Sequence, residues 1–138
     1  MAVFLDTGFI LALKNEDDKN HENAQSLMRD FLLNKYGTIY FNAFIYNEIV
    51  TLASVRIRNF DFTLNVATYL HKTDHLTMLW LLREDFLNAK ELFLKHAKRG
   101  LTFTDCTILA QCNRVNCKFL ATYDSHFDGL LETKFKSE

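Results

Sequence analysis

The feature that most constrains the fold of this chain is the alternation of short apolar runs with longer amphipathic stretches. The β-rich apolar runs lie at 2–5, 38–41, 76–81 and 118–122. Apolar residues recur at helical three- and four-residue spacing between them, over 8–13, 21–33, 43–58, 61–71, 84–98 and 105–115. Strands joined through helices pair in parallel with right-handed crossovers. We therefore predict a three-layer α/β/α fold around a mostly parallel sheet of about four to five strands.

Composition predicts one folded domain. The chain has 138 residues, of which 49% are hydrophobic and 24% charged, so it is too apolar for a disordered chain. A chain of this length buries about two-thirds of the surface that it exposes when unfolded, which is enough for a core. It contains no proline, and no Gly/Ser tract divides it. We expect residues 1–138 to form a single domain.

Cysteine usage and the N-terminal segment predict a cytoplasmic protein. Cys106, Cys112 and Cys117 are odd in number and lack the paired spacing of a zinc site, which is typical of reduced thiols. The first apolar stretch has no basic start and is interrupted by Asp6. It is neither a signal peptide nor a membrane span, which needs about 20 apolar residues. We expect no membrane segment.

Polar residues and one glycine mark three predicted helix ends. Asn42 precedes an apolar helical pattern and is expected to be its N-cap. Gly100 follows the helix predicted at 84–98, in the position where helices often end in a left-handed residue. Thr104 is expected to cap the helix that begins at Asp105.

Two acidic residues directly follow predicted strands. Asp6 follows the first apolar run and Asp124 follows the last. In open parallel sheets, ligands bind outside the carboxyl ends of the strands, so these two positions are candidates for chemistry. Each also has a purely structural interpretation, because Asp6 can cap the next helix and Asp124 can form an Asx turn.

Two further acids lie on helix faces that should be buried. Glu48 falls inside the apolar stripe of its helix, between Phe44 and Leu52. Asp105 opens a helix whose inward face carries Ile108 at the next turn. A buried carboxylate is costly unless a cation or hydrogen bonds receive it. The structural alternatives are an ion pair with Arg or Lys for Glu48 and a helix cap for Asp105.

Taken together, the four acids predict a metal site. All four capping or pairing interpretations would have to hold at once in a fold whose strand ends converge on one crevice. Several carboxylates in one cleft repel unless a cation neutralises them. Oxygen ligands without Cys or His partners favour Mg²⁺ or Mn²⁺ over Zn²⁺. Such ions activate water and offset charge on a phosphodiester.

In order and spacing the acidic motifs resemble the PIN domain family over essentially the whole chain. Asp6-Thr7 follows the first strand, Glu48 lies in an inward helix, Thr104-Asp105 opens another helix, and Thr122-Tyr-Asp124 ends the last strand. The resemblance implies an α/β/α metal-dependent ribonuclease, and many stand-alone members are toxins of VapBC-type toxin–antitoxin pairs. Carried over, the catalytic and metal-binding acids are Asp6, Glu48, Asp105 and Asp124, and the supporting hydroxyls are Thr7, Thr104 and Thr122.

The resemblance and the remaining residues predict partners. The expected substrate is RNA, and Arg56 and Arg58 after the Glu48 helix are candidates to contact its phosphates. Two central helices carry more aromatic residues than one core face needs, which predicts a homodimer or an antitoxin segment on the surface made by Phe44, Tyr46, Phe60, Phe62 and Tyr69. An RNA-maturation nuclease and a non-catalytic PIN-like binding module remain alternatives.

The overall charge is compatible with an RNA substrate once the predicted site is set apart. The chain has 16 basic and 17 acidic residues, a formal charge of -1, which at first argues against a nucleic-acid partner. Setting the four site acids aside leaves 13 acidic residues against the 16 basic ones. The protein around the site is therefore modestly basic.

Overall fold

The computed structural model describes residues 1–131 and 133–135 and contains one parallel sheet. Its strands are β1 (Ala2–Leu5), β2 (Thr38–Phe41), β3 (Leu76–Met78), β4 (Phe119–Ala121) and β5 (Thr133–Phe135). They lie in the order β3-β2-β1-β4-β5, and every neighbouring pair is parallel. The predicted α/β fold with a parallel sheet is confirmed, and β5 adds an edge strand that the sequence pattern did not indicate.

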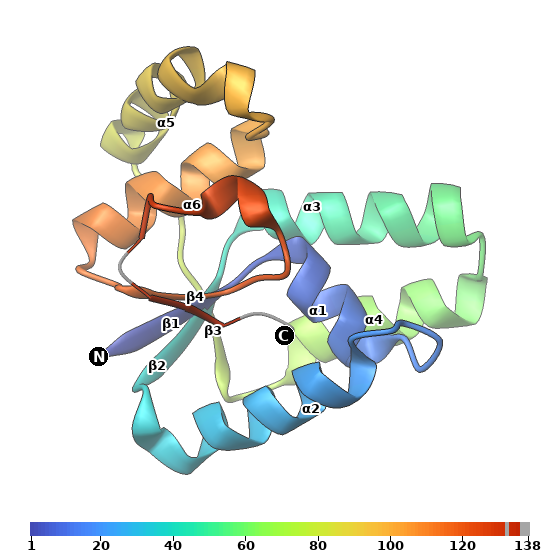
Figure 1. Ribbon diagram of the computed structural model, residues 1–138. Coiled ribbons are helices and arrows are strands. Elements are labelled where there is room, and N and C mark those ends of the chain that lie inside the picture. The colour runs from blue at the N-terminus through green and yellow to red at the C-terminus, as the bar shows by residue number, and fades with distance from the viewer. Residues whose placement is uncertain (132, 136–138) are drawn as a thin grey trace.

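Helices cover both faces of the sheet, as Figure 1 shows. The α-helices are α1 (Thr7–Lys14), α2 (His21–Asp30), α3 (Ala43–Leu52), α4 (Phe60–Lys72), α5 (Arg83–His96) and α6 (Phe103–Arg114). In the view of Figure 1, α5 and α6 lie above the sheet and α2 lies below it. This arrangement follows from the strand order, because the chain steps outward from β1 to β3 and then crosses back to β4, and right-handed crossovers place the two sets of helices on opposite faces.

The central strand β1 is apolar on both faces. All four of its residues are buried, as expected for a strand covered by helices on each side. Phe4 pairs with Tyr40 of β2 and with Leu120 of β4. Because β1 and β4 are adjacent and parallel, their carboxyl ends meet at the same edge of the sheet, where Asp6 and the residues after Ala121 follow.

Most helix boundaries lie close to the sequence prediction, although two helices end in π-helical turns. Helix α2 continues as a π-helical turn, η1 (Phe31–Lys35), and α3 continues as η2 (Ala53–Ile57), so both helical segments extend about as far as predicted. Asn42 caps α3, and Gly100 has a φ of 91° after the 3-10 turn η3 (Ala97–Arg99), which confirms both assignments. A further 3-10 turn, η4 (Ser125–Phe127), follows Asp124.

The predicted cap at Thr104 is wrong. Helix α6 begins at Phe103 and its N-cap is Thr102. The Thr102 hydroxyl accepts a hydrogen bond from the Asp105 amide at 3.1 Å, and the Asp105 carboxylate accepts one from the Thr102 amide at 2.9 Å. This reciprocal pair is a capping box, and it satisfies two amides that a cap at Thr104 would leave unpaired.

The structure bears on the expected reduced cysteines and on the expected lack of a membrane-spanning helix. The three cysteines are buried free thiols. Within the described part of the chain, no helix is both long and apolar enough to cross a membrane.

Candidate active site

All four predicted acids line a single cavity of about 300 Å³ at the carboxyl edge of the sheet. They reach it from four separate segments of the chain, the β1–α1 junction, α3, the start of α6 and the turn after β4. Its remaining lining residues are Thr7, Gly8, Leu11, Leu52, Thr102 and Tyr123. The fold therefore brings the four acids and Thr7 to one cavity, and adds Thr102.

Asp6 is a helix cap and a buried acid at once. Its Oδ1 accepts the Phe9 amide at 2.8 Å and so caps α1, while its Oδ2 accepts a short hydrogen bond from the Thr122 hydroxyl. The residue is only 6% exposed. Burial, reinforced by the nearby charges of Asp105 and Asp124, raises the pKa of Asp6 to about 7 in spite of these two hydrogen bonds.

Thr122 connects two of the acids. Its hydroxyl donates to Asp6 and accepts the Asp124 amide at 2.9 Å. Asp124 in turn accepts the His126 amide at 2.8 Å on Oδ1, and the Nδ1 of the His126 ring lies 2.9 Å from the same oxygen. The Asx-turn interpretation of Asp124 is therefore correct, and Asp124 still lines the cavity.

Asp105 sits in the first turn of α6, where the capping box uses its Oδ2. Its side chain is largely buried. Burial raises the pKa of the Asp105 carboxyl, and the charges of Asp124 and Glu48 raise it further. A capping box follows the pattern Thr-x-x-acid, so the signal that identifies Thr102 is present in the sequence three residues before Asp105.

Glu48 projects from α3 into the cavity and is half-buried. Among the described residues it has no salt-bridge partner, so the ion pair considered as its structural alternative is absent there. Its charge raises the pKa of Asp105 across the cavity. This acid is thus held opposite Asp105 without a cationic partner in the described part of the chain.

Asn42 fixes α3 relative to α6 and thereby aligns Glu48 with Asp105. It is fully buried, and its Oδ1 caps α3 by accepting the Ile45 amide at 2.9 Å. Its amide nitrogen donates across to α6, to Thr107 Oγ1 at 3.0 Å and to Gln111 Oε1 at 2.8 Å. The sequence analysis identified the cap but not this second role.

We expect Asn42→Ala to lower the free energy of unfolding by about 2 kcal/mol, because it removes a cap and leaves buried polar groups of α6 unpaired. Asn59 is a matched control, since it caps α4 in the same way through Phe62 at 3.0 Å but is exposed. Asn59→Ala should cost about 1 kcal/mol. Urea unfolding measures both variants, and equal losses would contradict the linking role of Asn42.

The predicted supporting residues occupy different places. Thr122 bonds to Asp6 as described, and the buried Thr7 lines the cavity with a hydroxyl that has no hydrogen-bond partner among the described residues. Thr104 is not among the residues that line the cavity. Arg56 and Arg58 are exposed at the end of the α3–η2 segment, beyond the cavity-lining Leu52, and do not line the cavity either.

The donor set matches a hard divalent cation in its chemistry. The cavity is lined by residues with carboxylate and hydroxyl oxygens and by no Cys or His, and the buried Thr7 hydroxyl has no hydrogen-bond partner among the described residues. Among the described residues, no three His, Cys, Asp or Glu side chains lie close enough together to hold an ion. An ion would therefore have to draw the mutually repelling carboxylates closer.

The sequence of this chain matches a known domain family over most of its length. The model of the PIN domain matches residues 3–130. The chain belongs to the PIN domain family. No match was found among curated proteins.

Solved structures share the fold of this PIN domain at low sequence identity. VapC20 from Mycobacterium tuberculosis, a toxin that cleaves the sarcin–ricin loop, is 22% identical with a TM-score of 0.78, over 91% of this chain and 92% of its own. FitAcB from Neisseria gonorrhoeae is 13% identical with a TM-score of 0.68, over 98% and 96%. VapBC2 from Rickettsia felis, bound to a promoter DNA fragment, is 17% identical with a TM-score of 0.65, over 99% and 100%.

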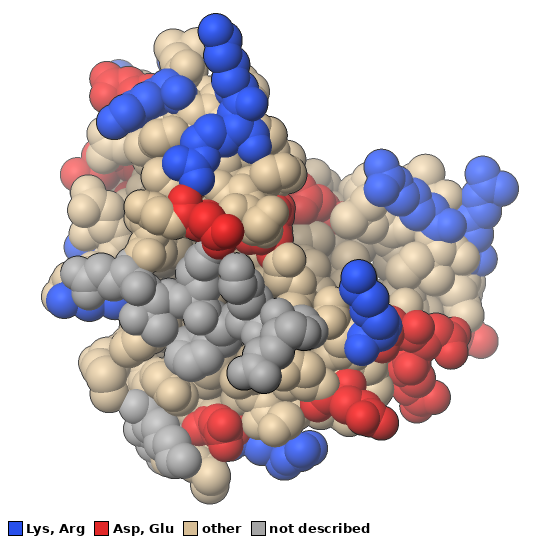
Figure 2. Space-filling model, viewed as in Figure 1, with Lys and Arg blue, Asp and Glu red and all other residues tan. Residues whose placement is uncertain are grey.

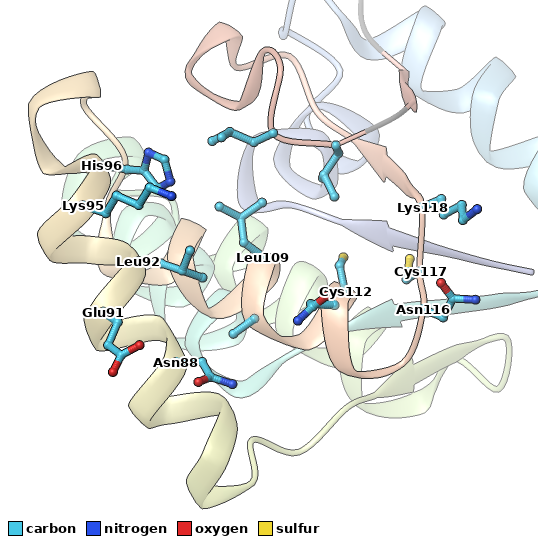
Figure 3. A pocket seen from close by; sticks show the side chains of 14 residues that line it. Asn88, Glu91, Leu92, Lys95, His96, Leu109, Cys112, Asn116, Cys117 and Lys118 are labelled. Carbon is cyan, nitrogen blue, oxygen red and sulfur yellow. The ribbon is translucent and has the colours of Figure 1, made fainter.

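The larger cavity of this PIN domain lies away from the acids. It has a volume of about 610 Å³ and lies between α5, α6 and the start of β4. Figure 3 shows its mixed lining, with Glu91 and Lys95 on α5 opposite Cys112 and Cys117. None of the four acids contributes to it, so this cavity is separate from the candidate site.

Proposed function

We propose that this PIN domain is a metal-dependent endoribonuclease that hydrolyses RNA phosphodiester bonds and acts as the toxin of a toxin–antitoxin pair. The observation that carries the proposal is the convergence of Asp6, Glu48, Asp105 and Asp124 on one cavity. Family membership supports the reaction class, and the likeness to VapC20, which cleaves an RNA loop, supports the substrate class.

In this proposal the four carboxylates hold Mg²⁺ or Mn²⁺, and Thr7 adds a hydroxyl oxygen beside them. When bound, the ion supplies a Lewis acid that offsets phosphate charge and makes water a stronger nucleophile. Thr122 keeps Asp6 and Asp124 in a fixed relation through its two hydrogen bonds. In the metal-free protein burial raises the pKa of Asp6 to about 7, and a bound cation would lower that pKa by favouring the ionised carboxylate.

Basic side chains flank the site rather than line it. Figure 2 shows Lys and Arg gathered over α5 and again around the outer end of α3, where Arg56 and Arg58 are exposed. Phosphates of a folded RNA could contact both groups while the scissile bond enters the acidic cavity between them. We propose Arg56 and Arg58 as RNA contacts that position the substrate.

We propose an antitoxin as the protein partner, with a homodimer of this chain as a second assembly. The likeness to FitAcB and to VapBC2 supports this assignment. The predicted aromatic surface must be corrected, because Phe44 and Tyr46 are partly buried through ring contacts with Phe103 and His71. Of the five predicted aromatics only Phe60 is exposed, at 74%, and its exposed apolar neighbours are Val55, Ile57 and Leu64.

Metal removal tests the reaction class. We expect the protein to cleave total RNA with Mg²⁺ and to lose at least about a hundredfold of that activity in excess EDTA, because one site metal contributes several kcal/mol to the transition state. Restoring Mg²⁺ or Mn²⁺ should restore cleavage. Equal cleavage in EDTA would contradict the proposal.

Two alternatives have distinct signatures in the same assay. An RNA-maturation nuclease would also need the metal, but it would trim precursor RNA and would not be inhibited by a partner encoded beside it. A non-catalytic binding module would bind RNA or protein without cleavage. The separation of the carboxylates in the described residues is the observation that keeps this second alternative open.

A further inference from the structure

The turn that carries Asp124 is fastened to the turn that precedes α6. The Nη2 of Arg99 donates to the carbonyl of His126 at 3.3 Å and also to the carbonyl of Asp128. These contacts join residues 27 and 29 positions apart in the sequence. On the α6 side, Gly100 lies only two residues before Thr102, which caps the helix and bonds to Asp105.

The ring of His126 completes this connection from the Asp124 side. Its Nδ1 lies 2.9 Å from Asp124 Oδ1, the oxygen that also accepts the His126 amide. The backbone amide and the ring nitrogen therefore both lie against one oxygen of Asp124, and within the described part of the chain the other oxygen has no partner. The imidazole thus packs on one oxygen of a carboxylate that lines the cavity.

Gly100 provides the space in which the ring sits. A Cβ at this position would lie 2.9 Å from His126 Nε2, closer than real Cβ atoms approach other atoms, and 3.1 Å from Cε1, so the ring would have to shift. Its φ of 91° also lies in the left-handed region that favours glycine. Gly129 has a comparable φ of 81°, but a Cβ there would meet nothing within 4 Å.

We propose that His126, seated against Gly100 and restrained by Arg99, is a positioning residue that sets the placement of Asp124 relative to Asp105. The inference rests on the proposed function, because it assigns a role at the proposed metal site. His126 touches Asp124 and not the substrate in this assignment. Its effect on cleavage is exerted through the carboxylate that it holds.

Two substitutions of His126 separate positioning from general stability. His126→Asn keeps a donor, because the Asn amide nitrogen occupies the place of Nδ1 and can still bond to Asp124, whereas His126→Ala removes it. Calorimetric titration with Mn²⁺ should show about tenfold weaker binding for His126→Ala and less than about threefold for His126→Asn, since partners that orient a metal ligand are worth 10- to 100-fold in affinity.

The two glycines provide an independent, matched pair. Gly100→Ala and Gly129→Ala both place an alanine at positive φ and so share the same backbone strain. Only Gly100→Ala pushes against the imidazole. We expect Gly100→Ala to weaken Mn²⁺ binding about as much as His126→Ala, the double variant to add little, and Gly129→Ala to bind like the parent protein.

Parent-like Mn²⁺ affinity of His126→Ala, or equal loss for the two glycine variants, would overturn the inference. The binding measurement is independent of the proposed reaction, because a parent protein that binds Mn²⁺ without cleaving RNA contradicts the nuclease and leaves this test intact. If the parent binds no Mn²⁺, crystal structures of parent and His126→Ala decide. A displaced Asp124 carboxylate supports the positioning role, and an unchanged one overturns it.

Discussion

We expect Asp6→Asn to abolish the proposed RNA cleavage and at the same time to stabilise the metal-free protein at neutral and alkaline pH. Cleavage should fall at least about a thousandfold, because the variant removes a central carboxylate from the proposed metal site. The amide can still accept the Phe9 hydrogen bond that caps α1. The fold is therefore expected to persist, and the loss of cleavage reports on the site.

The stability gain follows from the raised pKa of Asp6. Burial moves the pKa from 3.8 to about 7, so the folded protein binds this proton more tightly than the unfolded chain does. Well below pH 3.8 Asp6 is protonated in both the folded and the unfolded state, so it does not lower the free energy of unfolding. As pH rises from there to about 7, Asp6 ionises in the unfolded chain while it stays protonated in the folded protein. The free energy of unfolding therefore falls by on the order of 4 kcal/mol by pH 8.

Unfolding in urea with EDTA between pH 4 and pH 8 measures this effect. The parent should lose stability through this window, and Asp6→Asn should show a flatter profile and exceed the parent at pH 8. Adding Mg²⁺ should stabilise the parent and leave the variant unchanged. Asp17→Asn, at an exposed loop position, is the control and should match the parent in both assays. An active Asp6→Asn protein would contradict the assigned role.

We expect Arg114→Ala to lower the free energy of unfolding by about 3 to 5 kcal/mol. Arg114 on α6 donates from Nε to Asp85 Oδ1 at 2.7 Å, and the Asp85 side chain on α5 is only 1% exposed. The second Asp85 oxygen accepts the Leu82 amide at 2.8 Å and caps α5. Removing the guanidinium leaves a buried carboxylate without its counter-ion and weakens the contact between the two helices.

A double variant shows whether the buried charge is the cause. Asp85→Asn with Arg114→Ala keeps the hydrogen bond to Leu82 and removes the charge, so it should recover at least about 1 kcal/mol of the loss. Arg114→Lys should fall between the parent and Arg114→Ala, because lysine keeps the charge but lacks the planar donor geometry. A double variant no more stable than Arg114→Ala would locate the loss in packing instead.

Local patterns in the sequence predicted most of the architecture. The apolar runs of β1, β2, β3 and β4 and the helical periodicity between them are visible because each element buries a face or a stripe of its own residues. Helix ends were less accurate. The cap of α6 was misplaced by two residues because Thr102 and Thr104 are both suitable caps, and the Thr-x-x-Asp spacing that identifies Thr102 was overlooked until the hydrogen bonds with Asp105 revealed it.

At the candidate site, the same aspartate can cap a helical segment and also line the cavity. Asp6, Asp105 and Asp124 each satisfy backbone amides at the start of a helical segment, which accounts for their structural interpretation. Each of the three residues also lines the cavity, and a carboxylate offers more acceptor positions than one cap uses. The two interpretations of a single acid therefore could not be separated from the sequence.

The sequence by itself determined the order of the strands and helices in the chain, the family, and the four acids that stand where a solvated acid should not. These properties depend on spacing and on residue chemistry, which are local. The tertiary structure decided which groups meet. The Asn42 link to α6, the bridge of Thr122 between Asp6 and Asp124, and the seat of His126 against Gly100 join residues far apart in the chain. Such contacts depend on how helices cross and pack on the sheet, and no local pattern specifies that geometry.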